Sequence, residues 1–77
     1  MEKTIDVVKA PLAGQGQAYF LKSSVGPVVA VFPAFVSQGS QTIKIGHCTV
    51  FITGAAFEVA MNQEDFIELY TGNKKEQ

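Results

Sequence analysis

Residues 28–36 read Val-Val-Ala-Val-Phe-Pro-Ala-Phe-Val, a run in which every side chain is apolar. Successive side chains of a β-strand point to opposite faces, so a strand here presents two apolar faces. The chain's own core can bury one face, and something else then has to bury the other. Pro33 has no N–H to donate, which predicts that the strand lies at a sheet edge or breaks near Phe32.

Strand patterns flank this run on both sides. We expect strands over residues 3–9, which alternate until Pro11, over residues 17–22, and over residues 42–52. In the last of these the apolar positions change from odd to even at Gly46-His47, which requires a β-bulge or a tight turn. Residues 48–60 predict a hairpin that turns at Thr53-Gly54-Ala55, with Phe57 and Val59 directed inward and Glu58 outward.

A helix is predicted after the hairpin. Asn62 is a suitable N-cap, Asp65 follows three residues later, and Met61 and Phe66 are placed to form a hydrophobic staple. Gly72 supplies a left-handed stop. The apolar face of this helix consists of Phe66, Ile67, Leu69 and Tyr70.

These elements predict an α+β fold, with a small antiparallel sheet of four to five strands and one C-terminal helix packed on it. We expect a single domain over residues 1–72 and a polar tail over residues 73–77. The longest apolar run is much shorter than the ~18–20 residues of a membrane span, and the N-terminus alternates charge with apolar residues. We therefore expect no membrane contact and a cytoplasmic location.

The distribution of charge is the main functional signal. The chain has 77 residues, six lysines, no arginine and seven acids, so its formal net charge is −1. Between Ala10 and Phe57 only Lys22 and Lys44 carry a formal charge. A domain of this size leaves roughly two fifths of its surface in solvent. Because the cores of interfaces are poor in charge and rich in aromatic residues, this segment predicts a protein interface.

The sequence offers little catalytic chemistry. His47 and Cys48 are neighbours, so in a strand they point to opposite faces and cannot form a nucleophile–base pair with each other. One His and one Cys do not make a zinc site unless carboxylates or a second copy contribute, and one Cys excludes an internal disulfide. We expect no cofactor and no metal. Glu58, Glu64, Asp65 and Glu68 are interpreted as a solvated surface or as an acidic patch for a basic partner.

Residues 41–69 resemble a known type of small protein. The residues that carry the resemblance are the hairpin Thr-Val-Phe-Ile-Thr-Gly-Ala-Ala-Phe-Glu-Val at 49–59 and the short helix with an acidic cap that follows it. This pattern is similar to the flagellar FlbD/SwrD type of small protein and to many phage proteins of this length. The resemblance implies a small bacterial or phage accessory protein that binds a partner, and it assigns no functional residue.

The sequence therefore predicts a non-catalytic protein-binding module. One form of such a module is a phage-type inhibitor of a host macromolecular complex, with anti-CRISPR or other anti-defence action as an example. We expect self-association, as in a homodimer, or contact with another protein. The predicted partner-binding residues are an apolar set and an acidic rim, namely Val28, Val29, Val31, Phe32 and Phe35, with Glu64, Asp65 and Glu68.

Two other functions are considered. A nucleic-acid-binding β-module could use Tyr19, Phe20, Phe32 and Phe35 as stacking platforms, but such proteins carry a cationic footprint that this chain lacks. An enzyme would need a site assembled across a symmetric interface from His47 and carboxylates. The first predicts a steep loss of affinity with salt, and the second predicts loss of function in His47→Ala.

Overall fold

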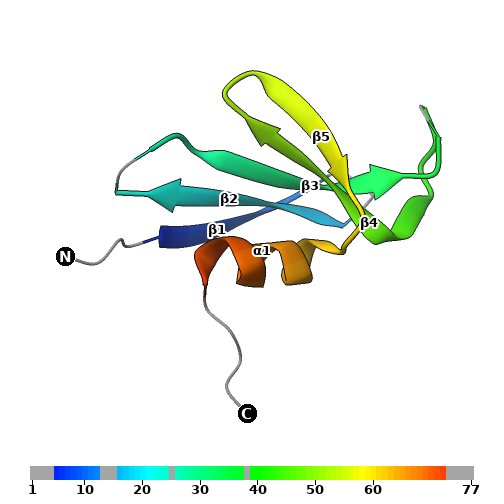
Figure 1. The fold of residues 1–77 in the computed structure, drawn as a ribbon. Coiled ribbons are helices and arrows are strands. Elements are labelled where there is room, and N and C mark those ends of the chain that lie inside the picture. The colour runs from blue at the N-terminus through cyan, green and yellow to red at the C-terminus, as the bar shows by residue number, and fades with distance from the viewer. Residues whose placement is uncertain (1–4, 13–15, 25, 38, 73–77) are drawn as a thin grey trace, which may run out of the picture.

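The fold is a five-stranded antiparallel sheet with one helix on it, seen in a computed structural model that describes residues 5–12, 16–24, 26–37 and 39–72 (Figure 1). The strands are neighbours in chain order, and the sheet is a simple meander. The elements are β1 (Ile5–Pro11), β2 (Gln17–Ser23), β3 (Val29–Phe35), β4 (Ile43–Ile52), β5 (Ala55–Val59) and α1 (Gln63–Thr71). The α+β class is confirmed, and the tail predicted at residues 73–77 lies outside the described residues.

Local turn chemistry explains the β4–β5 hairpin. Thr53 and Gly54 have φ angles of 44° and 84°, the two positive values that a type I′ turn requires. Gly46 is also left-handed, with φ 84°, at the position where the sequence changes phase. After it Cys48 and Val50 are buried, whereas Ile45 before it is 91% exposed. The register with β3 shifts between the pairs Pro33–Cys48 and Phe35–Ile43, so the predicted irregularity near Gly46 is confirmed, but it does not bring Ile45 into the core.

The core is a single layer of side chains between the sheet and α1. It consists of Tyr19, Leu21, Val29, Val31, Cys48 and Val50, against which Phe66 and Ile67 of the helix pack. The predicted caps of α1 are confirmed, because Asn62 Oδ1 accepts a hydrogen bond from the Asp65 backbone N–H at 2.8 Å and Gly72 has φ 71°.

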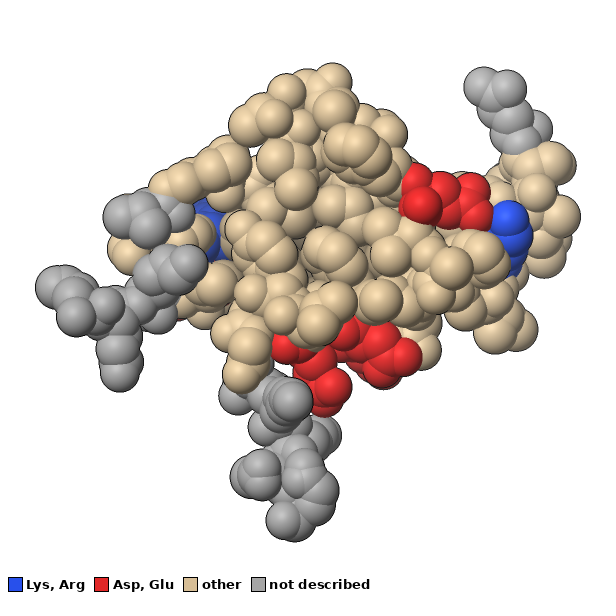
Figure 2. Space-filling view, in the orientation of Figure 1, with Lys and Arg blue, Asp and Glu red and all other residues tan. Residues whose placement is uncertain are grey.

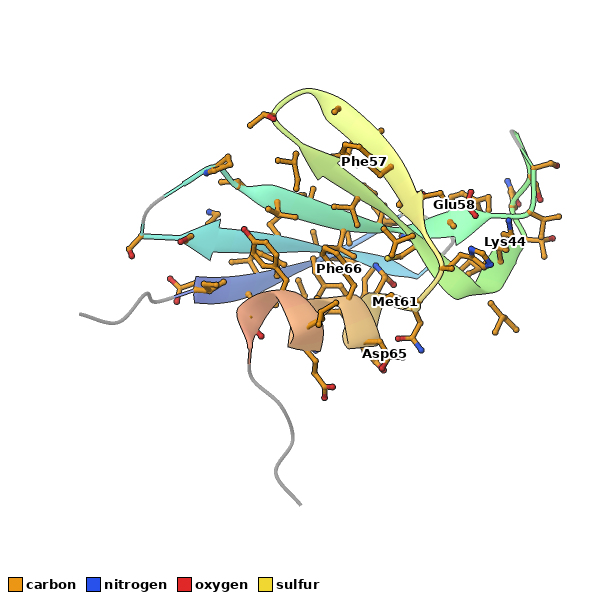
Figure 3. All side chains as sticks on the ribbon, viewed as in Figure 1. Lys44, Phe57, Glu58, Met61, Asp65 and Phe66 are labelled. Carbon is orange, nitrogen blue, oxygen red and sulfur yellow. The ribbon has the colours of Figure 1, made fainter. Side chains whose placement is uncertain are left out.

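Part of the expected core is solvent-exposed. Leu69 of the predicted helix face is 68% exposed, and Phe57 is 53% exposed although it was expected to point inward. The β4–β5 hairpin rises away from α1, so the helix does not reach the outer half of this hairpin (Figure 1). Figure 3 shows Phe57 on the hairpin, apart from Phe66 on the helix.

Both prolines in strands differ from expectation. The first strand was expected to end before Pro11, but Pro11 is the last residue of β1 and pairs with Gln17. Pro33 lies in the central strand of the sheet, so the predicted sheet-edge position is wrong. However, the pairing of β3 with β2 stops at Val31, and the register with β4 shifts between Pro33 and Phe35. Proline is tolerated because β3 has already separated from β2 where its missing N–H would have been needed.

Gln63, the first residue of α1, occupies the place where β2 and β3 separate. Its side-chain Nε2 donates hydrogen bonds to the Gln17 carbonyl at 2.8 Å and to the Val31 carbonyl at 2.9 Å. An amide nitrogen carries two hydrogens, so both are used. The side chain thus supplies donors that strand pairing no longer provides, and it fixes the start of the helix to the centre of the sheet.

Candidate protein interface

The strand register divides the sheet into two faces. Paired residues of antiparallel strands place their side chains on the same face, and alternate residues point to opposite faces. One face carries the core and α1. The other, which we call the open face, carries side chains from all five strands and lies on the side of the sheet opposite α1. Its residues include Asp6, Val8, Ala10, Ala18, Phe20, Lys22, Ala30, Phe32, Thr49, Phe51, Ala56 and Glu58, of which Ala18 is fully buried.

Three phenylalanines form the centre of the open face. The ring of Phe32 lies 6.1 Å from that of Phe20 and 5.2 Å from that of Phe51, both at an interplanar angle of 77°. Edge-to-face contacts of this kind contribute about 0.5–1.5 kcal/mol each beyond the area they bury. The three rings come from β2, β3 and β4, so they form one rigid apolar unit across the sheet. Phe51 is nevertheless 42% exposed.

Apolar residues extend this unit to both edges of the sheet. The register places Val8 beside Phe20, and it places Ala30 between Phe20 and Phe51. Ala56 lies beyond Phe51 on β5. A row of the open face therefore reads Val-Phe-Ala-Phe-Ala from β1 to β5 without a polar side chain. A contiguous apolar area of this kind, bordered by polar residues, is typical of an interaction site.

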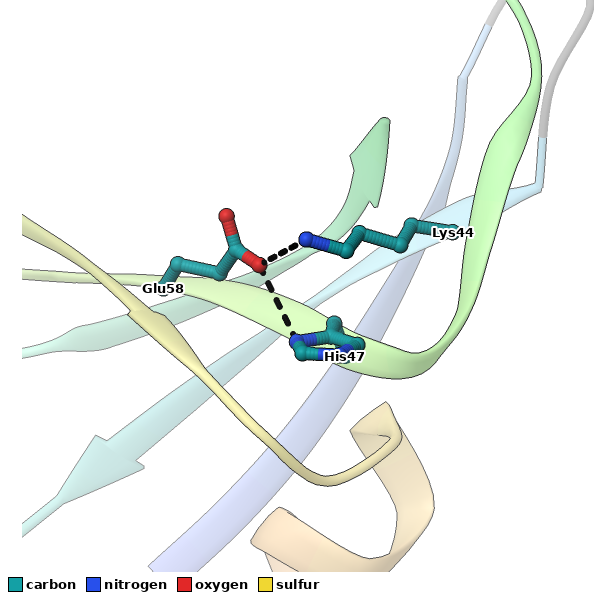
Figure 4. Close-up of polar contacts among 3 residues, drawn as sticks. All are labelled: Lys44, His47 and Glu58. Atoms are coloured by element: carbon teal, nitrogen blue, oxygen red, sulfur yellow. Dashed lines mark hydrogen bonds and ion pairs between the residues drawn. The ribbon is translucent and has the colours of Figure 1, made fainter. Parts of the chain in front are cut away.

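A small polar cluster borders the open face where β4 begins and β5 ends, away from the hairpin turn (Figure 4). Lys44 Nζ donates a hydrogen bond to Glu58 Oε2 at 2.9 Å. His47 Nδ1 lies 3.0 Å from the same oxygen, a distance that suits an ion pair, although the contact lacks hydrogen-bond geometry. The hydrogen bond from Lys44 lowers the pKa of the Glu58 carboxyl. This cluster joins the two strands of the hairpin and leaves little net charge at the border.

The predicted partner-binding residues do not form one surface. Val29 and Val31 are fully buried in the core, so their predicted role in partner contact is wrong. Val29 pairs with Leu21 and Val31 pairs with Tyr19. Paired residues share a face of the sheet, so all four side chains lie on the core face under α1. Val28 and Phe35 are exposed, and Phe32 lies on the open face.

The predicted acidic rim lies on the other side of the sheet. Glu64, Asp65 and Glu68 belong to α1, which packs on the core face. Figure 2 shows acidic side chains gathered over the helix, with an otherwise mostly uncharged surface around them. These acids therefore cannot border the open face. The prediction that they form a polar rim around Phe32 is wrong, because they lie on the opposite side of the sheet.

The geometry separates His47 from Cys48 as expected. Cys48 is fully buried on the core side, and burial raises the pKa of its thiol. His47 lies beside Glu58 on the hairpin (Figure 4). A histidine next to a carboxylate resembles a base with its orienting group, but the neighbouring thiol points away from it. Among the described residues, no three metal-ligating side chains gather in one place.

Sequence reasoning missed two residues that define the site. Phe51 was included only as a hairpin residue, although the run Val50-Phe51-Ile52 is apolar on both faces, like residues 28–36. That shared feature was the available signal. Gln63 gave no local signal, because its partners are 46 and 32 residues away in sequence.

Comparisons with protein-family models, with curated proteins and with solved structures find no match for this chain. The resemblance to the FlbD/SwrD type and to phage proteins stays a prediction. Within the described ranges, no helix has the length and apolar character that a membrane span requires.

Proposed function

We propose that this chain is a protein-binding module and that the open face is its binding surface. The observation that carries the proposal is the unit of three edge-to-face phenylalanines on the sheet face opposite α1. Aromatic side chains held rigidly by their neighbours lose little entropy on binding, and they dominate the energy of protein interfaces. If the protein acts as an inhibitor, the open face is the part that would occupy the surface of a larger complex.

The charges around the open face favour a protein over a nucleic acid. Lys22 is the register partner of Asp6, and Lys44 is bound to Glu58, so each lysine has a carboxylate beside it or opposite it. Proteins that stack bases on exposed aromatic rings combine those rings with a positive groove for the phosphates. The open face has the rings without that groove.

Photo-crosslinking tests this proposal. A photoreactive phenylalanine analogue replaces Phe51 in one variant and Phe57 in a matched control, because both rings are exposed on the same hairpin but on opposite faces. We expect the analogue at position 51 to form adducts with another polypeptide chain, whether foreign or identical, in cells that produce the protein. The analogue at position 57 should form far fewer. Equal labelling from both positions, or none from position 51, would exclude the open face as the binding surface.

A further inference from the structure

The monomer leaves most of its phenylalanine surface outside the core. The chain has six phenylalanines, and none of them is fully buried: three are half-buried, including Phe66 against the core, and three are exposed. Nor does α1 contribute a buried residue. The fully buried positions with the largest side chains are Leu21, Val29, Val31 and Cys48. Phenylalanine normally supplies much of the buried area of a small domain, so this molecule lacks a layer that its composition would support.

We propose that a second copy of the chain supplies this layer, so that the protein is a two-fold symmetric dimer whose open faces pack against each other. This inference rests on the proposed function and names its partner. The resulting arrangement has four layers, with a helix outside each sheet. Phe20, Phe32 and Phe51 of both copies lie between the two sheets. Facing sheets pack about 10 Å apart, a spacing that two interdigitating layers of side chains fill.

The order of residues across the open face suits a two-fold contact. The row of Val8, Phe20, Ala30, Phe51 and Ala56 has a small residue at its centre and a ring on each side of it. A two-fold axis parallel to β3 places β2 of one copy over β4 of the other. Phe20 then meets Phe51 of the second copy twice, by symmetry, and Ala30 lies near the axis. Each ring of the row thus has an aromatic partner in the second copy, and Val8 faces the small side chain of Ala56.

The charges also suit a second copy. The charged residues of the open face and its border are Asp6, Lys22, Lys44 and Glu58, two acids and two lysines, and their formal sum is zero. The acids of α1 lie on the far side of each sheet. Two open faces can therefore approach without opposing like charges, whereas a strongly charged partner finds no complementary field.

The size of the open face is close to the lower limit for a specific dimer. Five strands at about 4.8 Å spacing and about 20 Å of strand length give a footprint of roughly 480 Å². Two copies therefore bury on the order of 1,000 Å² in total, at the lower limit of specific interfaces.

Sedimentation equilibrium of the full chain tests the dimer, with Phe51→Ser as the disrupting variant and Phe57→Ser as the matched control. One copy has a mass of 8.3 kDa, so two give 2 × 8.3 = 16.6 kDa. We expect a wild-type dimer at micromolar concentration, and a control dimer of the same affinity. Loss of the exposed part of Phe51 from both copies removes roughly 170 Å² of contact, which raises the dissociation constant of the dimer about a thousandfold.

Circular dichroism checks that each variant is folded. If Phe51→Ser does not fold alone, the melting temperature of the wild type is measured at several protein concentrations instead. The melting temperature of a dimer rises with protein concentration, and that of a monomer does not. A wild type that is monomeric with a constant melting temperature overturns the dimer. So does a dimer that Phe51→Ser leaves intact, or one that Phe57→Ser weakens equally. If a monomeric wild type still crosslinks from position 51 to a foreign chain, only the second copy is wrong and the proposed function stands.

Discussion

Replacing Gln63 by alanine tests how α1 is fixed to the sheet. The side-chain amide donates to two backbone carbonyls, those of Gln17 and Val31, and both contacts are partly buried. Each such hydrogen bond contributes about 1 kcal/mol net, and its loss leaves a carbonyl without a protein donor. We therefore expect Gln63→Ala to lower the free energy of unfolding by about 2 kcal/mol, which corresponds to a fall in melting temperature of about 10 °C for a domain of this size.

Gln63→Glu sharpens this test through pH. An ionised carboxylate has no hydrogen to donate and faces two carbonyl oxygens, so we expect it to be more destabilising than alanine at pH 7. This environment raises the pKa of the new carboxyl in the folded state. A raised folded-state pKa favours the folded form as the pH falls, because the folded chain then binds the proton more tightly. The extra loss relative to Gln63→Ala should therefore shrink toward pH 4.

Urea denaturation followed by circular dichroism measures both variants, at one fixed protein concentration. Gln41→Ala is the control, because Gln41 is an exposed glutamine outside the helix and the strands. Its free energy of unfolding should lie within about 0.5 kcal/mol of the wild type. The reasoning fails if Gln63→Ala has the same free energy of unfolding as this control. It also fails if the difference in that free energy between Gln63→Glu and Gln63→Ala is the same at pH 7 and at about pH 4.

Three further predictions concern other contacts. Asn62→Ala should cost about 1 kcal/mol of stability in the same assay because the N-cap is lost, whereas Asn62→Asp should cost little. The Cys48 thiol should resist a thiol reagent in the native protein and react in urea; rapid native reaction would contradict its burial. The lowered pKa of Glu58 means that its contact with Lys44 stabilises the fold above the ordinary carboxyl pKa and stops doing so as the pH falls through the lowered value. Glu58→Gln should therefore be less stable than the wild type at pH 7 and equal to it at strongly acidic pH, and a constant difference would refute this.

The sequence predicted those parts of the fold that depend on near neighbours. The cap at Asn62 and the turn at Thr53-Gly54 are set within a few residues, so their side-chain and backbone chemistry is visible in the sequence. The same holds for the phase change at Gly46, where a single left-handed residue redirects the strand. These features together were sufficient for the α+β class and the order of the elements.

The assignment of faces could not be predicted in the same way. Alternation showed that the strand at residues 28–36 has two apolar faces, but both faces satisfy the same hydrophobic pattern. The choice depends on where α1 docks, and the contacts of Gln63 with Gln17 and Val31 link residues distant in sequence. For this reason Val29 and Val31 were assigned to an interface that in fact belongs to Phe32 and its neighbours.

The division of side-chain size between the two faces supports an interface on the open face. Under α1 the sheet presents Leu21, Val29 and Val31, compact side chains that fit a closely packed helix. The rings of Phe20, Phe32 and Phe51 all project from the opposite face. A chain selected only to fold alone would gain more by burying those rings, because a buried phenylalanine removes more apolar area from water than a valine does. Their common placement on the face opposite α1 favours a contact that forms after, or together with, folding.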